Sequence, residues 1–208
     1  MQLVKATRDA LLRPLQIVSG IVERRHTLPI LANILIRKDG SKVTLLSTDI
    51  EVQISTHAEI GAGSDVTATT VAARKLLDIL RALPDTQEVS LSMTNKRLTV
   101  QSGKSRFALQ TLAAEEFPTV AVADTYNTHV SLPQKTLKHL FNMVHFSMAQ
   151  QDIRYYLNGL LLVVEGNNII AVATDGHRLA FCQIATEQQF TRQEVIIPRK
   201  TIMELQRL

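Results

Sequence analysis

The sequence predicts an α+β fold in which one domain occurs twice, each copy an antiparallel sheet with two basic helices. Two observations predict this fold. An apolar run that meets Arg-Lys and continues as an amphipathic helix stands at residues 71–80, and nearly the same pattern returns at 197–205. Between the helical segments, runs of apolar residues are separated by turn dipeptides, which is typical of antiparallel strands.

A shared offset relates the two halves of the chain. The matching positions are Arg74 and Arg199, Asn33 and Asn158, and Leu12 and Leu137, each 125 residues apart, and Thr48 and Thr174, 126 apart. This period is far longer than a solenoid repeat, so it indicates duplicated domains, which we place at residues 1–125 and 126–208. A full second copy would end at about residue 250, so we expect a piece of a longer protein.

In the first copy, leucines at helical spacing predict helices at 8–25 and 74–83. Thr7 is the expected N-cap of the first helix, and Pro14 should kink or shorten it. Strands are predicted at 31–37, 43–47, 50–56 and 66–72, with a hairpin turn at Asp39-Gly40. A meander follows at 89–93, 98–100 and 106–110, with turns at Asn95-Lys96 and Ser102-Gly103.

The second copy repeats this order after a connection at 113–128. A strand is predicted at 129–133 and a helix at 134–145, whose apolar and basic residues form separate stripes. Strands follow near 155–164, 168–173, 178–185 and 195–197, with a turn at Gly166-Asn167. A last helix is predicted at 198–208.

The positive charge is concentrated on the predicted helices. The chain has a net charge of +4. The four helical segments carry twelve Lys and Arg against four acidic residues, or +8, and each is net +2, so the remaining residues sum to −4. This pattern favours one basic layer that faces nucleic acid. The alternative is an ordinary solvated surface, which usually mixes both signs.

Several classes of protein are disfavoured. No run of about 18 apolar residues occurs, so no membrane span or membrane partner is expected. The single cysteine, Cys182, rules out an internal disulfide and fits a cytoplasmic protein, with its thiol as a small buried hydrophobe.

The sequence contains no recognisable catalytic machinery, and we expect no enzyme, no metal and no cofactor. Gly103-Lys104-Ser105 is similar to the end of a phosphate-binding loop, but the pattern needs glycine at position 98, which is leucine. Asp175-Gly176-His177 has no accompanying nucleophile and is explained by a tight turn. A phosphoryl-transfer enzyme using Lys104 and a peptide-docking adaptor with basic helices remain as alternatives.

Tyr155 and Tyr156 are two of three tyrosines. On a strand, neighbouring side chains point to opposite faces, so one ring should be more exposed. With Arg154 beside them, they favour a surface that contacts nucleic acid or a peptide; aromatic packing in the sheet is the alternative.

The sequence resembles the bacterial sliding clamp family, the beta subunits of the replicative DNA polymerase III. The matching runs are Leu-Pro-Ile-Leu at 28–31, Ala-Arg-Lys at 73–75, Ser-Gly-Lys-Ser-Arg-Phe at 102–107, Phe-Ser-Met-Ala at 146–149, Gln-Asp-Ile-Arg-Tyr-Tyr-Leu-Asn-Gly at 151–159, Ala-Thr-Asp-Gly-His-Arg-Leu-Ala at 173–180 and Pro-Arg-Lys at 198–200. They span nearly the whole chain in the order of the family.

The resemblance implies a DNA-clamp fold and a non-catalytic processivity factor. The family forms a head-to-tail homodimeric ring of six similar domains, three per chain, whose helices line a hole for double-stranded DNA. Its expected partners are the replicative polymerase catalytic subunit, the clamp loader, and other polymerases and repair proteins that carry clamp-binding peptides. Because a third domain is absent from this sequence, we expect weak, salt-sensitive DNA binding and weak or no peptide capture by this chain.

The resemblance also assigns residues to three sites. The DNA-contacting positions are Arg25, Arg74, Gln151, Tyr155, Tyr156 and Lys200. The peptide-binding positions are Arg154, Leu157, Thr174, Gly176, His177, Arg178 and Leu179. The positions that contact the neighbouring subunit are Lys75, Ile79, Leu83, Lys104, Arg106, Phe107 and Leu109, some of them on an expected edge strand.

Overall fold

The computed structural model describes residues 1–22, 28–121 and 124–207. The chain divides into two compact units, Met1–Ala121 and Val122–Leu208, each of which is considered by itself. Within the described residues, every helix is too short or too polar to cross a membrane.

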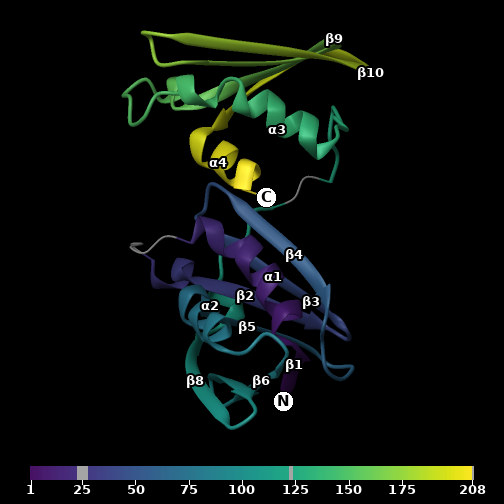
Figure 1. Cartoon of the computed structure of the whole chain (residues 1–208), viewed down its shortest axis with the longest axis vertical. Helices are drawn as coiled ribbons and strands as arrows, with labels where there is room; N and C mark the ends of the chain where they lie inside the picture. The colour runs from purple at the N-terminus through teal and green to yellow at the C-terminus, as the bar shows by residue number, and fades with distance from the viewer. Residues whose placement is uncertain (23–27, 122–123, 208) are drawn as a thin grey trace. The chain divides into compact units, whose positions relative to one another are not determined.

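The first unit contains an antiparallel sheet of eight strands (Figure 1). In spatial order these are β1 (Gln2–Thr7), β6 (Glu88–Thr94), β7 (Arg97–Ser102), β8 (Ser105–Leu112), β5 (Val66–Ala72), β2 (Asn33–Asp39), β3 (Lys42–Thr48) and β4 (Gln53–Glu59). The two outer strands meet, because Val4 forms a bridge with Gly61 just after β4, and the amide of Ala62 donates to the Leu3 carbonyl at 3.1 Å. The sheet is therefore curled back on itself.

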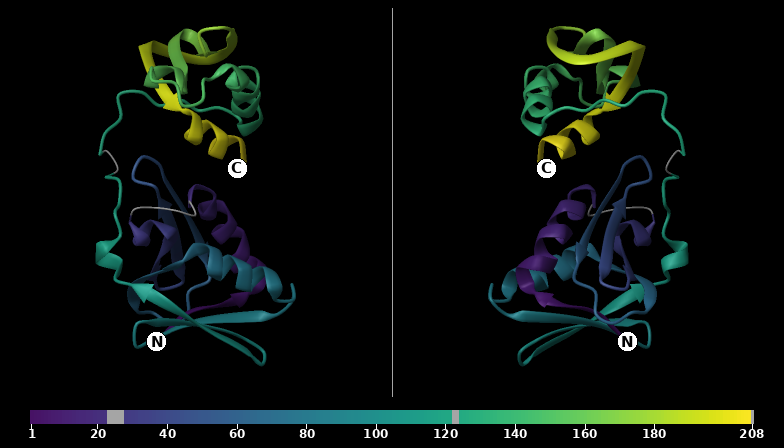
Figure 2. Two further views of the ribbon diagram at one scale, coloured as in Figure 1. Left: turned by 90° about the vertical axis from the view of Figure 1, so that its left-hand side faces the viewer. Right: turned by 90° about the vertical axis from the view of Figure 1, so that its right-hand side faces the viewer.

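Two helices, α1 (Arg8–Val18) and α2 (Ala73–Ala82), lie next to each other in this unit (Figure 2). Leu11 and Leu15 of α1 and Leu76 and Leu80 of α2 are fully buried in one cluster with strand residues such as Ile36. Each such side chain contributes roughly 1.5–3 kcal/mol relative to an exposed one. The burial of the apolar face leaves the opposite face of each helix to solvent.

The first helix is shorter than the sequence predicts. It ends at Val18, where the Ser19 amide and hydroxyl both bind the Leu15 carbonyl, and a 3₁₀ turn, η1 (Ser19–Ile21), follows. Pro14 lies inside the helix and is buried. Thr7 stands at the N-cap position but makes no side-chain capping bond. The predicted end at residue 25 lies outside the described residues.

The predicted hairpin turns of the first unit are present. Gly40 has φ +59 between β2 and β3, and Asn95 and Lys96 have φ +49 and +59 between β6 and β7, as two-residue hairpin turns require. Two strand starts are predicted too early. Residues Pro29–Ala32 form a 3₁₀ turn, η2, and the amide of Val52 donates to the Asp49 carboxylate at 2.7 Å in a turn that precedes β4.

The second unit pairs two long antiparallel strands, β9 (Gly159–Thr174) and β10 (Leu179–Pro198). Two helices, α3 (Gln134–Asn142) and α4 (Arg199–Arg207), lie on one side of this pair (Figure 1). Leu140 and Phe141 of α3 and Ile202 of α4 are buried against strand residues such as Leu160 and Ile169. The helices thus share one core with the sheet.

Several predicted elements of the second unit differ from the structure. Residues 129–133 form no strand, and α3 ends at Asn142 before a 3₁₀ turn, η4 (His145–Ser147). The segment predicted as a strand from 155 begins with another 3₁₀ turn, η5 (Tyr155–Leu157). Gly166 has φ +56, as a turn needs, yet β9 continues through it, and β10 likewise joins two predicted strands.

The strand pairing of the two units follows one register. Asn33 faces Ala72 in the first unit, and Gly159 faces Pro198 in the second. Each residue of the second pair lies 126 positions after the corresponding residue of the first. Thr48 faces Gln53, and Thr174 faces Leu179, again 126 residues later. The helices start at 8 and 134, and at 73 and 199, with the same difference. The repeated arrangement extends to individual cross-strand pairs.

Candidate functional site

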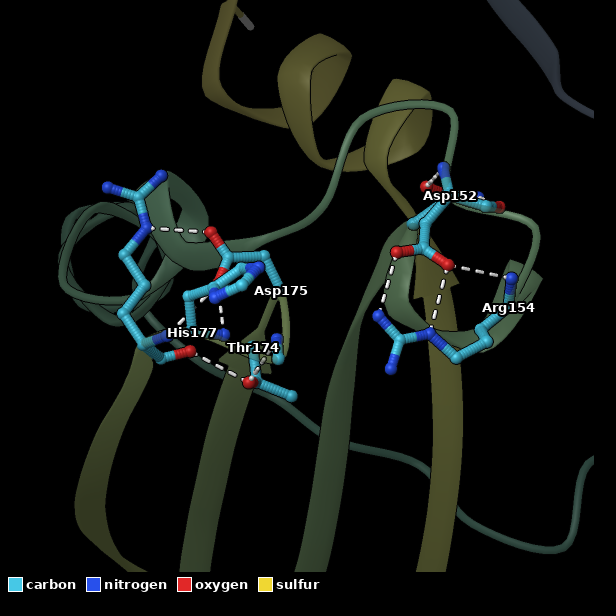
Figure 3. Close-up of polar contacts among 8 residues, drawn as sticks. Asp152, Arg154, Thr174, Asp175 and His177 are labelled. Carbon is cyan, nitrogen blue, oxygen red and sulfur yellow. Dashed lines mark hydrogen bonds and ion pairs between the residues drawn. The ribbon is translucent and has the colours of Figure 1, made fainter.

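A tight turn between β9 and β10 carries four of the predicted peptide-binding residues (Figure 3). The Thr174 hydroxyl donates to the Arg178 carbonyl at 2.7 Å and accepts the Gly176 amide at 3.1 Å. The Asp175 carboxylate accepts the amides of His177 and Arg178 and the Arg178 Nε, each at 3.0 Å. The two backbone amides, with Arg178 as a further contributor, lower the pKa of Asp175.

A second segment, residues 151–158, is organised by Asp152 (Figure 3). Its Oδ1 accepts the Arg154 amide at 2.9 Å and the Arg154 Nε at 3.0 Å, and its Oδ2 accepts Nη2 at 2.9 Å. The two hydrogen bonds from the Arg154 guanidinium, together with the one from the Arg154 backbone amide, lower the pKa of Asp152 to about 2. The Asp152 amide and carbonyl bind the Asn158 side chain at 2.9 and 2.8 Å, which closes the segment.

The two segments meet at Gly176. This residue has φ +88, and a Cβ built on it would lie 3.2 Å from Nη2 of Arg154 and 3.5 Å from Nη1. The guanidinium of Arg154 therefore rests against the glycine backbone in space that a side chain would fill. On the other side of the turn, the Arg178 guanidinium lies 5.9 Å from the centroid of the Phe146 ring, in cation–π geometry.

A cleft of about 370 Å³ opens beside these two segments. Its lining residues are Phe146, Met148, Ala149, Gln150, Asp152, Arg154, Asp175, His177, Arg178 and Arg199. Three of the predicted peptide-binding residues belong to this set. Leu157 and Leu179 do not line it; Leu157 is buried, and Leu179 is 65% exposed.

Sequence reasoning missed Asp152 and Asp175 as the residues that orient the two arginines. It also missed Phe146 and Met148, which form the apolar wall of the cleft, although their run Phe-Ser-Met-Ala is part of the family resemblance. The spacing of each Asp two or three residues before an Arg is the signal that could have identified the pairs.

Two of the four predicted DNA-contacting residues of the second unit line a different hollow. Gln151 and Lys200 line an open depression of about 780 Å³ together with Arg199 and Met203. Tyr155 and Tyr156 are 82% and 49% exposed, and their rings stand edge to face with centroids 5.9 Å apart. The predicted strand is wrong here, because both tyrosines lie in η5, but one ring is indeed more exposed than the other.

The basic character of the helices is uneven. As bounded in the structure, α2, α3 and α4 are each net +2, whereas α1 is net +1. Arg8 of α1 is neutralised, because its Nη1 lies 2.7 Å from carboxylate oxygens of both Asp9 and Asp85. Arg74 of α2 is exposed, with its Nη2 at 3.5 Å from the Val22 carbonyl. Arg25 lies outside the described residues.

Strand β8 carries three of the seven predicted subunit-contact residues, Arg106, Phe107 and Leu109. It is not an edge strand in the sheet order, but among the described strands β5 pairs with it only at Thr111 and Leu112. From Ser105 to Gln110 it therefore has a hydrogen-bonded neighbour, β7, on one side only. Phe107 on this stretch is 38% exposed.

The remaining subunit-contact residues differ in exposure. Lys75 on α2, Lys104 in the β7–β8 turn and Arg106 on β8 are exposed, whereas Ile79 is half-buried. Leu83 and Leu109 are buried in the same core cluster.

Gly103, in the turn between β7 and β8, has φ +54, so the Gly-Lys-Ser run closes a hairpin and does not open a helix. Within the described residues, no three His, Cys, Asp or Glu side chains gather as a metal site.

Comparison with known proteins identifies the family. The sequence matches the family models described as DNA polymerase III beta subunit, N-terminal domain, over residues 1–121 and central domain over residues 131–208. A beta sliding clamp from Pseudomonas putida is 46% identical over 202 residues, which is 97% of this chain and 55% of that protein. The chain thus spans about half the length of the curated relatives that it matches.

The comparison with solved structures identifies the same family. The DNA polymerase III subunit beta from Pseudomonas aeruginosa has a TM-score of 0.94 at 44% identity, over 100% of this chain and 56% of that one. A sliding clamp from the same organism, bound to griselimycin, has a TM-score of 0.93 at 43% identity, over 99% of this chain and 56% of that one. These comparisons confirm the predicted α+β clamp fold, and the chain belongs to the DNA polymerase III beta subunit family, the bacterial beta sliding clamps.

Proposed function

We propose that this chain acts as part of a DNA sliding clamp, a non-catalytic processivity factor of the bacterial replicase. In this role the clamp encircles duplex DNA as a head-to-tail homodimeric ring in the cytoplasm. It tethers the polymerase catalytic subunit, the clamp loader and other proteins that carry clamp-binding peptides. The observation that carries the proposal is the match to both the N-terminal and the central domain of the family, with 46% identity to a named clamp.

The proposed DNA surface consists of Arg25, Arg74, Gln151, Tyr155, Tyr156 and Lys200. The net +2 charge on each of α2, α3 and α4 supports it. Contacts of Lys and Arg with phosphates carry little sequence information and weaken with salt, because binding releases counterions. Such contacts hold a duplex without fixing it to one sequence, which is what sliding requires.

The proposed peptide site consists of Arg154, Leu157, Thr174, Gly176, His177, Arg178 and Leu179. The contact of Arg154 with Gly176 supports it, because it brings two segments of the set together at one cleft. Exposed Leu179 offers apolar surface, and the two arginines offer donors to a peptide.

The proposed subunit contact uses Lys75, Ile79, Leu83, Lys104, Arg106, Phe107 and Leu109. The one-sided pairing of β8 from Ser105 to Gln110 supports it, since the free N–H and C=O groups of such a strand can pair with a strand of another chain. Partly exposed Phe107 on the same stretch adds apolar area to such a contact.

Retention on DNA of different topology tests the proposal. The full-length clamp, of which this chain is proposed to be a part, is incubated with nicked circular plasmid, with and without a clamp loader. Protein that stays on the DNA at about 0.5–1 M salt, which screens phosphate contacts, is measured before and after linearisation. Retention on circles that is lost on linearisation supports encirclement. Equal retention on both forms would contradict encirclement and favour an adaptor that docks peptides.

A further inference from the structure

The carboxylate of Asp152 is the centre of the loop that precedes β9. Among the described residues it accepts three hydrogen bonds, all from Arg154: one from the backbone amide and two from the guanidinium, at 2.9–3.0 Å. The side chain of Asp152 is only 22% exposed, and that of Arg154 is 48% exposed. A paired, partly shielded guanidinium has far fewer accessible rotamers than a solvated one.

The contact partner of this arginine is a residue without a side chain. Nη2 and Nη1 of Arg154 lie 3.2 and 3.5 Å from the place where a Cβ of Gly176 would stand. The backbone amide of Gly176 donates a hydrogen bond to the Thr174 hydroxyl, and the residue has the positive φ of +88. The Asp152 carboxylate thus binds the arginine through which the 151–158 segment approaches the β9–β10 turn.

We propose that Asp152 is a positioning residue of the peptide site, which holds the Arg154 guanidinium against Gly176 before any ligand binds. The inference rests on the proposed peptide-binding function. Its physical basis is preorganisation: a side chain that is already ordered does not lose its rotamer freedom on binding, which otherwise costs about 0.5–1.5 kcal/mol.

The loop does not need the carboxylate for its own closure. The bonds between Asp152 and Asn158 use the backbone amide and carbonyl of Asp152, and the Asn158 carbonyl accepts the Arg199 amide at 2.9 Å. Asp152→Ala therefore removes the three bonds to Arg154 and leaves the closure intact. We expect this variant to keep the fold, with an unchanged backbone amide spectrum away from residues 151–158.

The second aspartate provides a matched control. Asp175 holds Arg178 as Asp152 holds Arg154, through a backbone amide and Nε, and its side chain is 23% exposed. Asp175→Ala removes a comparable set of bonds from the neighbouring turn. If the effect of Asp152 is specific, only Asp152→Ala releases Arg154.

The first measurement needs no ligand. In nuclear magnetic resonance spectra of the wild-type chain, the Arg154 Nε–H signal is expected to be resolved and slow to exchange with water. It should move to the position of a solvated arginine and exchange fast in Asp152→Ala, but persist in Asp175→Ala. An Arg154 signal that is unchanged in Asp152→Ala would overturn the proposal, whether or not the chain binds peptides.

The second measurement uses griselimycin as the probe, titrated into the wild-type chain, Asp152→Ala, Arg154→Ala and the double variant. Asp152→Ala should weaken binding about 2- to 10-fold, which is the ordering cost of one such side chain. It should have no further effect once Arg154 is alanine. Release of Arg154 with unchanged affinity, or an additive double variant, would overturn the positioning role. No binding to the wild-type chain would contradict the proposed peptide site for this probe, and the Arg154 signal alone would then decide whether Asp152 holds the arginine.

Discussion

At the scale of single residues, two aspartates set the geometry of the candidate peptide site. Asp152 and Asp175 each bind a backbone amide and the guanidinium of an arginine that follows within three residues. Local bonds of this kind order a loop without a packed core, because the charged acceptor satisfies several donors at once. The arginines are consequently presented to solvent in fixed orientations.

Substitution of Gly176 tests the close approach of Arg154. Gly176→Ala places a Cβ 3.2 Å from Nη2, so the guanidinium must move, and φ +88 also strains any residue with a side chain. We expect weaker griselimycin binding and a loss of stability of about 1–2 kcal/mol. Thermal unfolding and a binding titration measure both effects.

Gly166 supplies the control for this variant. Its φ is +56, but a Cβ there would meet nothing within 4 Å. Gly166→Ala should therefore lower stability through backbone strain while leaving griselimycin affinity unchanged. Equal losses of affinity in both variants would show that strain, and not the displacement of Arg154, is responsible.

The protonation of Asp152 provides a pH test. The bonds from Arg154 lower its pKa from 3.8 to about 2, so the folded chain favours the carboxylate. The resulting stabilisation is complete above the unfolded pKa, near 3.9, and is lost as pH falls through about 2. The carboxyl carbon shift of Asp152, followed from pH 5 downwards, should show this low midpoint; a midpoint near 3.8 would contradict the pairing.

At the scale of elements, helices follow from the sequence more reliably than their ends. Apolar residues at helical spacing predict the first three helices, and the repeated Arg-Lys run predicts the fourth; each helix buries apolar residues on one side. The ends fail where a local side chain intervenes: the Ser19 hydroxyl binds Leu15 and stops α1 early. Likewise, apolar alternation predicts strands at 31–37 and 50–56, but Pro29 and Asp49 start turns that delay both strands.

The basic helices make a prediction for DNA binding. Arg74→Glu combined with Lys200→Glu reverses two charges, one on α2 and one on α4. We expect weaker binding to duplex DNA and a fall of about 1 in the slope of log affinity against log salt for each lost phosphate contact. Fluorescence anisotropy over a series of salt concentrations measures both.

An exposed lysine outside the helices is the control for this pair. Lys42→Glu, at the start of β3, changes the net charge by as much as one of the two reversals. Its slope should stay at the wild-type value. If Lys42→Glu lowers affinity and slope as much per charge, the effect is one of overall charge and the helical surface has no special role.

The core of the second unit makes a stability prediction. Leu140 of α3 is fully buried among residues of the strands and α4. Leu140→Ala should destabilise this unit by about 2–5 kcal/mol, because it removes buried methyl groups and leaves a cavity. Urea unfolding monitored at residues of the second unit measures the loss. Val130→Ala, at a position that is 42% exposed, should cost less than about 0.5 kcal/mol.

At the scale of the whole molecule, the internal repeat is the part of the structure that the sequence predicts best. Asn33 and Arg74 give an offset of 125 and Thr48 gives 126, and pairs such as Asn33–Ala72 and Thr48–Gln53 recur 126 residues later. The continuous β9 and β10 were not predictable, because Gly166 carries the same turn signal as Gly40. The approach of Arg154 to Gly176 was not predictable either, since the two residues are distant in the sequence, whereas the pairing of Arg154 with Asp152 has a signal in their spacing.

The common register has a consequence for how the two halves can be exchanged. The segments 33–72 and 159–198 have equal length, and each begins and ends on a facing pair of residues in the same ladder. A transplant of one segment into the place of the other would start and finish at equivalent sheet positions without any insertion or deletion. These two segments thus have one length and one pairing register, although their residues differ at most positions.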